Sequence, residues 1–164
     1  MNQPTTLKVI KNKLGLLELA RELGSVSRAC DIFGYSRDSF YRFKKLSLKL
    51  GFSIPINVFG PGLAIVHYGT IVVNASSKVG KNCRIQTCTN IGASGGRSEA
   101  PQIGENVYIG PGAVIYGNIK LGNNIAIGAN SVVNKSFEET DIMIGGVPAQ
   151  KIKEIDIKTI IKHI

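Results

Sequence analysis

The sequence contains no tryptophan, only two histidines and only three cysteines among its 164 residues. The cysteines (Cys30, Cys83 and Cys88) are odd in number and form no Cys-x-x-Cys pair, so we expect neither a disulfide framework nor a zinc site. No run of apolar residues approaches the ~18 that a membrane-spanning helix needs. The first six residues lack the basic-then-apolar order of a signal peptide. These absences predict a protein of the reducing cytoplasm that holds no metal and has no membrane partner.

Charge and glycine are distributed unevenly along the chain, whose formal net charge is +9. Residues 1–50 contain ten Lys or Arg and four Asp or Glu, whereas 16 of the 19 glycines lie after residue 50. The first part is typical of basic helices, and the second of short strands with turns. We therefore expect a helical segment over 1–45, a β domain over 46–153 and a short helical tail over 154–164.

Aliphatic residues recur at every sixth position over most of the second part. A helix requires a period of 3.6 and a plain strand a period of 2, so a period of six fits neither. It fits short strands joined by tight turns, in which three hexads make one triangular coil and coils stack about 4.8 Å apart. The fold is therefore predicted to be mostly β, as a parallel β-helix. Its inward residues would be Val73, Val79, Ile85, Ile91, Ile103, Ile109, Ile115, Leu121, Ile127 and Val133.

Two further positions of the hexad carry a pattern. Glycine often follows the aliphatic residue directly, and we expect it to supply backbone angles that β-branched residues resist. A small side chain often comes four residues after the aliphatic one, where we expect a crowded corner of the coil. The glycines are Gly80, Gly92, Gly104, Gly110, Gly122 and Gly128.

These hexads resemble those of the hexapeptide-repeat acyltransferases, and so does the closing run Gly145-Gly146-Val147-Pro148-Ala149. The run from Ala64 to Thr70 is similar to the serine acetyltransferase branch, and closest to its short relatives associated with capsule or surface-polysaccharide synthesis. The resemblance covers roughly residues 46–153. It implies a left-handed β-helix, an exception to the usual right-handed crossover, and acetyl-CoA as the acyl donor.

His67 is the candidate catalytic residue. Acyl transfer from a thioester to a hydroxyl needs a base near neutrality, and an imidazole, with an ordinary pKa of about 6.5, is suited to that work. His67 lies two hexads ahead of Val79, at a corner of the coil, and matches the family's catalytic histidine. The resemblance implies that His67 deprotonates the acceptor hydroxyl and then protonates the leaving thiolate. The alternative is a structural histidine on a turn.

Three other residues could carry the chemistry in principle. His163 lies one residue from the C-terminus, and a fraying tail is a poor place to hold a base. Cys83 and Cys88 could act as nucleophiles. Cys83, however, occupies the small inward position of its hexad, which favours packing, and no basic group obviously activates either thiol.

Coenzyme A brings three phosphate groups and a long flexible arm. The resemblance implies that small residues offer backbone groups to that arm and that lysines after the closing turn contact phosphate. The alternative is that the fold itself requires the small residues and that the lysines are simply solvated. The candidates are Gly92, Ala93, Ala113, Ala129, Lys151 and Lys153.

The run 92–102 interrupts the repeat and is expected to contact the acceptor, unless it is a plain connector. Serine acetyltransferases carry a carboxylate where this chain has Val66, a second one that aligns with Ser53, and an Arg-His pair that aligns with Glu99 and Ala100. Because a free amino acid is charged at both ends, it should need such partners. Since this chain lacks those partners, we expect the acceptor to be a hydroxyl of serine or, at least as readily, of a sugar. The candidate acceptor-binding residues are Val66, Glu99 and Ala100.

The resemblance also implies a homotrimer with its site between adjacent β-helices, because one coil wall has no cleft deep enough for both substrates. The alternative for this part of the chain is an inactive scaffold that only assembles.

The first fifty residues predict a helix-turn-helix. We expect a first helix with an apolar face at Leu14, Leu17 and Leu23, ended by Gly24. A second helix over 26–33, capped by Ser25 or Ser27, is then followed by a turn at Gly34 and by a third helix that follows Ser36 and runs into Lys45. Residues 5–45 resemble the leading segment of insertion-sequence integrases, which implies nucleic-acid contact through residues 25–45. No acidic catalytic domain follows, so transposition is excluded. The side chains expected on the exposed face of the third helix are Arg37, Tyr41, Arg42, Lys44 and Lys45.

Two familiar pieces in one chain suggest a fusion. The helix-turn-helix would then be a passenger or a structural cap of the β-helix. The functional alternative is a DNA-binding protein that uses the β-helix as a trimerisation scaffold, in which three basic modules multiply the apparent affinity for DNA.

Overall fold

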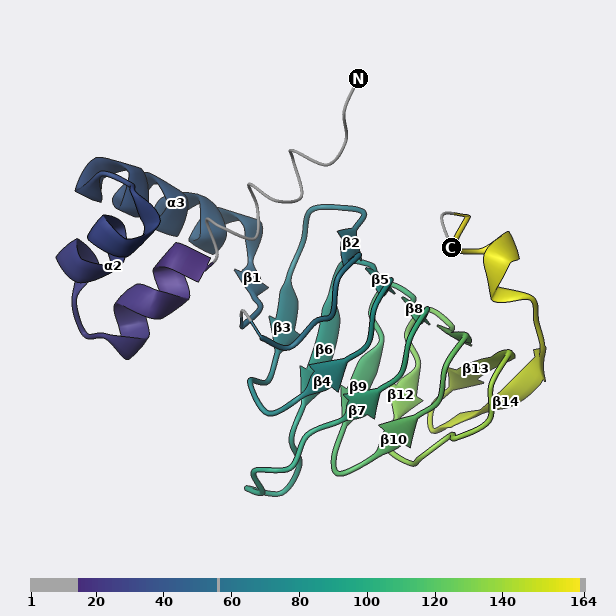
Figure 1. Ribbon diagram of the computed structural model, residues 1–164. Helices are drawn as coiled ribbons and strands as arrows, with labels where there is room; N and C mark the ends of the chain where they lie inside the picture. Colours follow the sequence, from purple (N-terminus) through teal and green to yellow (C-terminus); the bar gives the residue numbers. More distant parts are fainter. Residues whose placement is uncertain (1–14, 56, 163–164) are drawn as a thin grey trace.

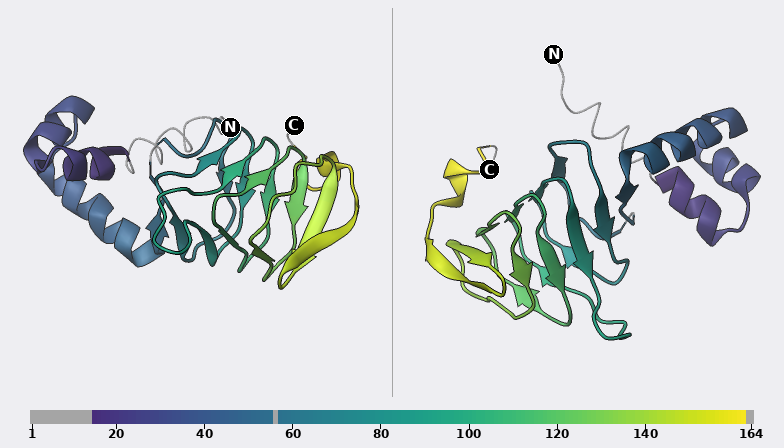
Figure 2. Two further views of the ribbon diagram at one scale, coloured as in Figure 1. Left: turned by 90° about the horizontal axis from the view of Figure 1, so that it is seen from below. Right: turned by 180° about the vertical axis from the view of Figure 1, so that it is seen from behind.

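The computed structural model describes residues 15–55 and 57–162. It consists of a group of helices followed by a stack of triangular coils (Figure 1). The helices lie at one end of the stack and the C-terminal segment lies at the other, as the two further views show (Figure 2). The predicted fold class, mostly β with helices at the N-terminal side, is confirmed.

The α2 helix (Val26–Phe33) begins and ends where the capping residues predict. Residues 15–22 are helical, and α2 is capped by Ser25, whose side chain accepts a hydrogen bond from the backbone N–H of Arg28. Gly34 ends α2 with a φ of 69°. The α3 helix (Arg37–Leu50) continues beyond residue 45, where we expected the helical segment to end. Buried residues of this group are Leu16, Ala20, Ala29, Cys30 and Phe40.

The β part is a left-handed β-helix with three faces, each a sheet of stacked short strands. The five-stranded sheet has the order β1-β3-β6-β9-β12, the three-stranded sheet β10-β7-β4, and the six-stranded sheet β14-β13-β11-β8-β5-β2. The strands are β1 (Phe52–Ser53), β2 (Ala64–Ile65), β3 (Ile71–Val73), β4 (Lys78–Val79), β5 (Arg84–Ile85), β6 (Thr89–Gly92), β7 (Gln102–Ile103), β8 (Tyr108–Ile109), β9 (Val114–Tyr116), β10 (Lys120–Leu121), β11 (Ile125–Ile127), β12 (Val132–Val133), β13 (Ile142–Gly146) and β14 (Ala149–Glu154).

Strand register shows the coil length. Ile109 pairs with Ile127, eighteen positions later, as three hexads per coil require. Ile85 pairs with Ile109, twenty-four positions later, because the run between β6 and β7 adds one hexad's length to that coil. All ten aliphatic residues predicted to point inward are buried, with exposed fractions of 5% or less. The repeat therefore predicts both the fold and its core correctly.

The reason we gave for the repeated glycines is wrong. None of the six glycines that follow an aliphatic residue has a positive φ. A Cβ added at Gly104 would instead lie 2.5 Å from the carbonyl oxygen of Gly122 in the next coil, and one at Gly110 would lie 2.7 Å from that of Ile127. Glycine is needed at these two positions because neighbouring coils approach closely there.

The left-handed backbone conformation occurs two residues after these glycines and mostly at asparagine. Asparagine tolerates this conformation better than most other residues with a side chain. Asn82, Asn106 and Asn124 have φ values of 57°, 55° and 56°. Their side chains form a ladder: the amide of Asn82 donates to Asn106 at 2.9 Å, and that of Asn106 donates to Asn124 at 2.9 Å. The ladder ends on the carboxylate of Asp141, 3.0 Å from Asn124.

An antiparallel hairpin closes the stack. β13 pairs with β14, which is the last strand of the six-stranded sheet. The expected helical tail is one turn of 3₁₀ helix, Ile157–Thr159, capped by Asp156. Ile157 and Ile161 pack against Ala126. Within the described ranges, no helix has the length and apolar character to cross a bilayer.

Candidate functional site

Two corners of the coil border the five-stranded sheet. The His67 corner joins the six-stranded sheet to the five-stranded sheet and contains residues 66–70, 86–88, 110–113 and 128–131. The loop corner joins the five-stranded sheet to the three-stranded sheet and contains residues 74–77, 93–101, 117–119 and 134–136. Every sequence-predicted site residue before the closing hairpin lies at or beside one of these corners.

His67 lies on a two-residue bulge. Ile65 pairs with Ile85, twenty positions later, whereas Val72 pairs with Asn90, eighteen positions later. The segment from Ile65 to Val72 is therefore two residues longer than the segment that lies beside it in the next coil. The backbone N–H of Val66 still donates to Ile85, at 3.4 Å.

The coil resumes at Gly69, which lies against Thr87: a Cβ at Gly69 would collide with the threonine hydroxyl. The extra residues are therefore His67 and Tyr68. Both side chains are exposed, and Tyr68 is 82% exposed. The bulge thus presents the imidazole to solvent.

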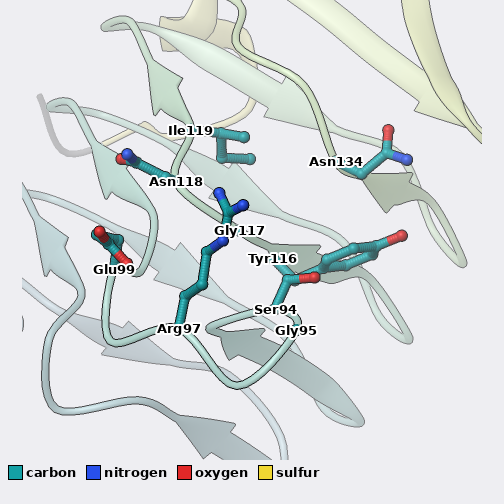
Figure 3. A pocket seen from close by; sticks show the side chains of 9 residues that line it. All are labelled: Ser94, Gly95, Arg97, Glu99, Tyr116, Gly117, Asn118, Ile119 and Asn134. Atoms are coloured by element: carbon teal, nitrogen blue, oxygen red, sulfur yellow. The ribbon is translucent and has the colours of Figure 1, made fainter.

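The loop corner contains a cavity of about 480 Å³ (Figure 3). Residues 93–101 form one wall, while β9 and the turn that follows it form the other. In the view of Figure 3, Arg97 extends from the loop toward Gly117. The lining residues are Ser94, Gly95, Arg97, Glu99, Tyr116, Gly117, Asn118, Ile119 and Asn134.

The predicted acceptor residues do not meet in one chain. Glu99 lines the cavity, whereas Ala100, its neighbour, is only 2% exposed and faces the core. Val66 is half-buried at the His67 corner. The two groups lie on opposite edges of the five-stranded sheet, so a single copy of the chain separates His67 from the cavity.

The small residues predicted to line a coenzyme A arm are divided in the same way. Ala113 and Ala129 lie at the His67 corner; Ala129 is exposed, but Ala113 is fully buried. The N–H of Ala113 donates to Gly110 and its carbonyl accepts from Asn90, so its backbone groups already serve the coil. Gly92 ends β6, and Ala93 is the first residue of the loop corner.

The two predicted phosphate ligands lie on β14. Lys151 is 2.5 Å from Glu139 and 3.9 Å from Glu154. The hydrogen bond to Glu139 raises the pKa of Lys151 above its ordinary value, so this lysine stays charged at neutral pH. Lys153 is exposed on the same strand. His163, the rival base, lies outside the described residues.

The cysteines differ in burial. Cys83 is 1% exposed, and burial raises the pKa of its thiol to about 12, so it is not ionised at neutral pH and makes a poor nucleophile. Cys30 is buried in the helical group, and Cys88 is exposed at the His67 corner. Among the described residues, no group of three His, Cys, Asp or Glu side chains is placed to hold a metal.

The difference in burial among the three cysteines predicts how many thiols react in the native protein. At pH 8, one thiol (Cys88) should react rapidly with a chromogenic disulfide reagent, and three should react after denaturation, because burial keeps Cys30 and Cys83 from the reagent. A Cys88→Ser variant is the control and should show no rapid thiol. Two rapid thiols in the native protein would contradict the burial of Cys30 or of Cys83.

Sequence reasoning missed Arg97, Tyr116, Asn118 and Asn134 as site residues. The signal for Arg97 was its place in the run that interrupts the repeat. The other three are ordinary outward positions of regular hexads, and only the fold of the loop over them shows that they share a cavity.

Comparisons with known proteins agree with the fold. The family described as Bacterial transferase hexapeptide (six repeats) matches residues 100–135. A serine acetyltransferase of Staphylococcus aureus (strain Mu50 / ATCC 700699) is 34% identical over 101 residues, which are 60% of this chain and 47% of that protein. Protein YlbG of Escherichia coli (strain K12) is 53% identical over 53 residues, 32% of this chain and 43% of that protein.

Solved structures of serine acetyltransferases are also similar. The enzyme of Brucella abortus strain S19, in complex with coenzyme A, has a TM-score of 0.66 at 25% identity, covering 91% of this chain and 56% of that chain. The enzyme of Neisseria gonorrhoeae, in complex with serine, has a TM-score of 0.60 at 31% identity, covering 76% of this chain and 52% of that chain.

The chain spans about half the length of the curated serine acetyltransferases it matches. These matches name neither an integrase nor a capsule enzyme, so those two resemblances stay predictions. The repeats, the three-sided coil and the matches together show that the chain contains a hexapeptide-repeat β-helix similar to that of the serine acetyltransferases.

Proposed function

We propose that this protein is an acetyl-CoA-dependent O-acetyltransferase that acetylates a hydroxyl of serine or of a sugar. The observation that carries the proposal is His67, the only histidine among the described residues, exposed on a bulge of a serine acetyltransferase-like β-helix. The test is release of coenzyme A thiol from acetyl-CoA in the presence of each acceptor class, compared between the native chain and a His67 variant.

His67 acts as the general base in this proposal. Its imidazole takes the proton of the acceptor hydroxyl while that oxygen attacks the thioester carbonyl, and backbone N–H groups stabilise the oxyanion. The C–S bond then breaks, and the imidazolium returns its proton to the thiolate of coenzyme A. The products are the acetyl ester and free coenzyme A, and His67 is regenerated.

The donor would lie along the coil stack from the His67 bulge toward β14. Five strand steps separate β2 from β14 in the six-stranded sheet, roughly 24 Å at the usual spacing. An extended pantetheine arm suits such a path, past exposed Ala129. Lys153 is then available to contact a phosphate group of coenzyme A. Lys151 would have to release Glu139 before it could bind such a phosphate. The coenzyme A complex of the Brucella relative supports this donor.

The proposed assembly is a homotrimer. One copy leaves His67 and the cavity on opposite edges of the five-stranded sheet, so the site is complete only if the cavity of one copy faces the His67 corner of the next. The outer side of that sheet supports such contact, because Val72 is 39% exposed and Val114 and Val132 are half-buried. The proposed compartment is the cytoplasm, whose reducing conditions suit three free cysteines.

DNA binding by the helical segment is a second candidate function, favoured by one face of α3. Arg37, Tyr41, Lys44 and Lys45 are all exposed, and their i, i+4, i+7, i+8 spacing places them on one side of the helix. The α3 helix is the second helix of the helix-turn-helix, and a basic, exposed helix in that place is suited to contact phosphates and the DNA groove.

Salt dependence tests this candidate. Loss of three phosphate contacts in an Arg37→Ala/Lys44→Ala/Lys45→Ala variant should reduce the slope of log affinity against log salt by about 2.7. The matched control removes Lys78, Lys120 and Lys135, exposed lysines of the β-helix, and should keep the native slope. If the native chain fails to retain duplex DNA at 50 mM salt, the passenger interpretation holds.

A further inference from the structure

The cavity at the loop corner is larger than a three-carbon amino acid needs. Its volume of about 480 Å³ lies within the ~300–1,000 Å³ range of sites that enclose drug-sized ligands. We propose that this cavity is the acceptor subsite and that it takes a hexose or N-acetylhexosamine unit, free or at the end of an oligosaccharide. This inference rests on the proposed O-acetyltransferase function and narrows its acceptor to one class.

The hydrogen-bonding groups of the cavity match a sugar. Arg97 presents N–H donors in a planar fork, the ionised carboxylate of Glu99 only accepts, and the amides of Asn118 and Asn134 do both. Each sugar hydroxyl both donates and accepts, and a pair of adjacent hydroxyls suits the two parallel bonds that a forked group makes. Four forked side chains around one cavity can therefore engage several hydroxyls together.

The cavity is lined by one positive and one negative side chain, and both can bind a ligand. Arg97 and Glu99 are the charged residues that line it, and within the described ranges neither takes part in an ion pair. A polyanion would be repelled by Glu99. A zwitterionic serine would engage both charges, but its three-carbon frame fills only part of a cavity of about 480 Å³. An uncharged polyol uses all four groups.

Tyr116 adds a flat apolar surface. It ends β9, is half-buried and lines the cavity on the side opposite Glu99 in the view of Figure 3. An aromatic ring combines an apolar body with a polar tip. The C–H face of a pyranose can pack on the ring while its hydroxyls turn toward Arg97 and the amides.

The acceptor experiment measures thiol release from acetyl-CoA with L-serine, glucose, galactose, N-acetylglucosamine and maltose at equal concentrations. We expect the best sugar to be at least about 10-fold faster than serine. An Arg97→Ala/Glu99→Ala variant should lose at least about 100-fold in kcat/KM for that sugar, mainly through KM, because two side chains that make charged hydrogen bonds are removed. The control, Lys81→Ala/Glu105→Ala, removes an ion pair of 3.0 Å that does not line the cavity, and should match the native chain.

Ligand-observed NMR without acetyl-CoA separates this inference from the proposed function. The preferred sugar should bind the native chain and the control variant, and should bind the cavity variant much more weakly. Serine turnover faster than every sugar, or no sugar binding, overturns the sugar inference and leaves the O-acetyltransferase proposal standing. Thiol release that no acceptor raises above the level of a His67→Ala variant overturns both.

Discussion

Replacing His67 with alanine is expected to slow the release of coenzyme A thiol by about 10²–10⁴-fold, the usual contribution of a positioned general base. The melting temperature should stay unchanged, because the imidazole is exposed on a bulge and supports no core contact. The measurement is initial velocity at saturating acetyl-CoA with the preferred acceptor, paired with a thermal melt of each protein.

The matched control for this substitution is His163→Ala, which removes the other histidine of the sequence. It should retain native activity, because the proposed mechanism assigns no role to the C-terminus. Full activity in His67→Ala, or an equal loss in both variants, would show that His67 is not the base. A lower melting temperature in His67→Ala would indicate that the imidazole has a structural role.

The second large effect concerns stability. A Gly110→Ala substitution should lower the free energy of unfolding by about 3 kcal/mol, the upper part of the range for overpacked sites. The new Cβ would lie 2.7 Å from the carbonyl oxygen of Ile127 and 2.8 Å from the backbone N of Ala129. Both atoms belong to the backbone of the next coil, which cannot move without disturbing the stack. Chemical denaturation checks the value.

Gly128→Ala is the control, because Gly128 holds the same hexad position but has space. The nearest atom to its added Cβ is the hydroxyl oxygen of Ser131 at 3.4 Å, and its φ is not positive. Alanine should therefore be neutral or stabilise by up to about 1 kcal/mol, through lower entropy of the unfolded chain. Equal destabilisation by both substitutions would mean that intercoil approach does not explain these glycines.

The six-residue period predicted the β-helix and its core because each inward residue meets only its counterparts in the coils above and below. Ile109 and Ile127 are the same position one coil apart, so their burial follows from spacing alone. The role of glycine did not follow in the same way. Intercoil approach at Gly110 is a property of the assembled stack, whereas a single hexad suggests only backbone freedom.

The site was predictable only in part. His67 could be found because it is a rare residue with suitable chemistry inside a recognisable motif. Its bulge could not, because the two extra residues appear only when Ile65 is paired with Ile85. Arg97 and Asn134 share a cavity although they are far apart in the sequence, and no periodic pattern links an irregular loop to the regular hexads beneath it.

Complementation between copies tests the central claim most directly, which is that one copy supplies His67 and the next supplies the cavity. The His67→Ala and Arg97→Ala/Glu99→Ala variants would be co-expressed with different tags, and mixed trimers would be isolated and assayed for thiol release. Each isolated mixed trimer should have one restored site of three, about one third of the native activity, because each site draws its two halves from different copies of a cyclic assembly. Mixed trimers no more active than the separate variants would contradict a site shared between copies.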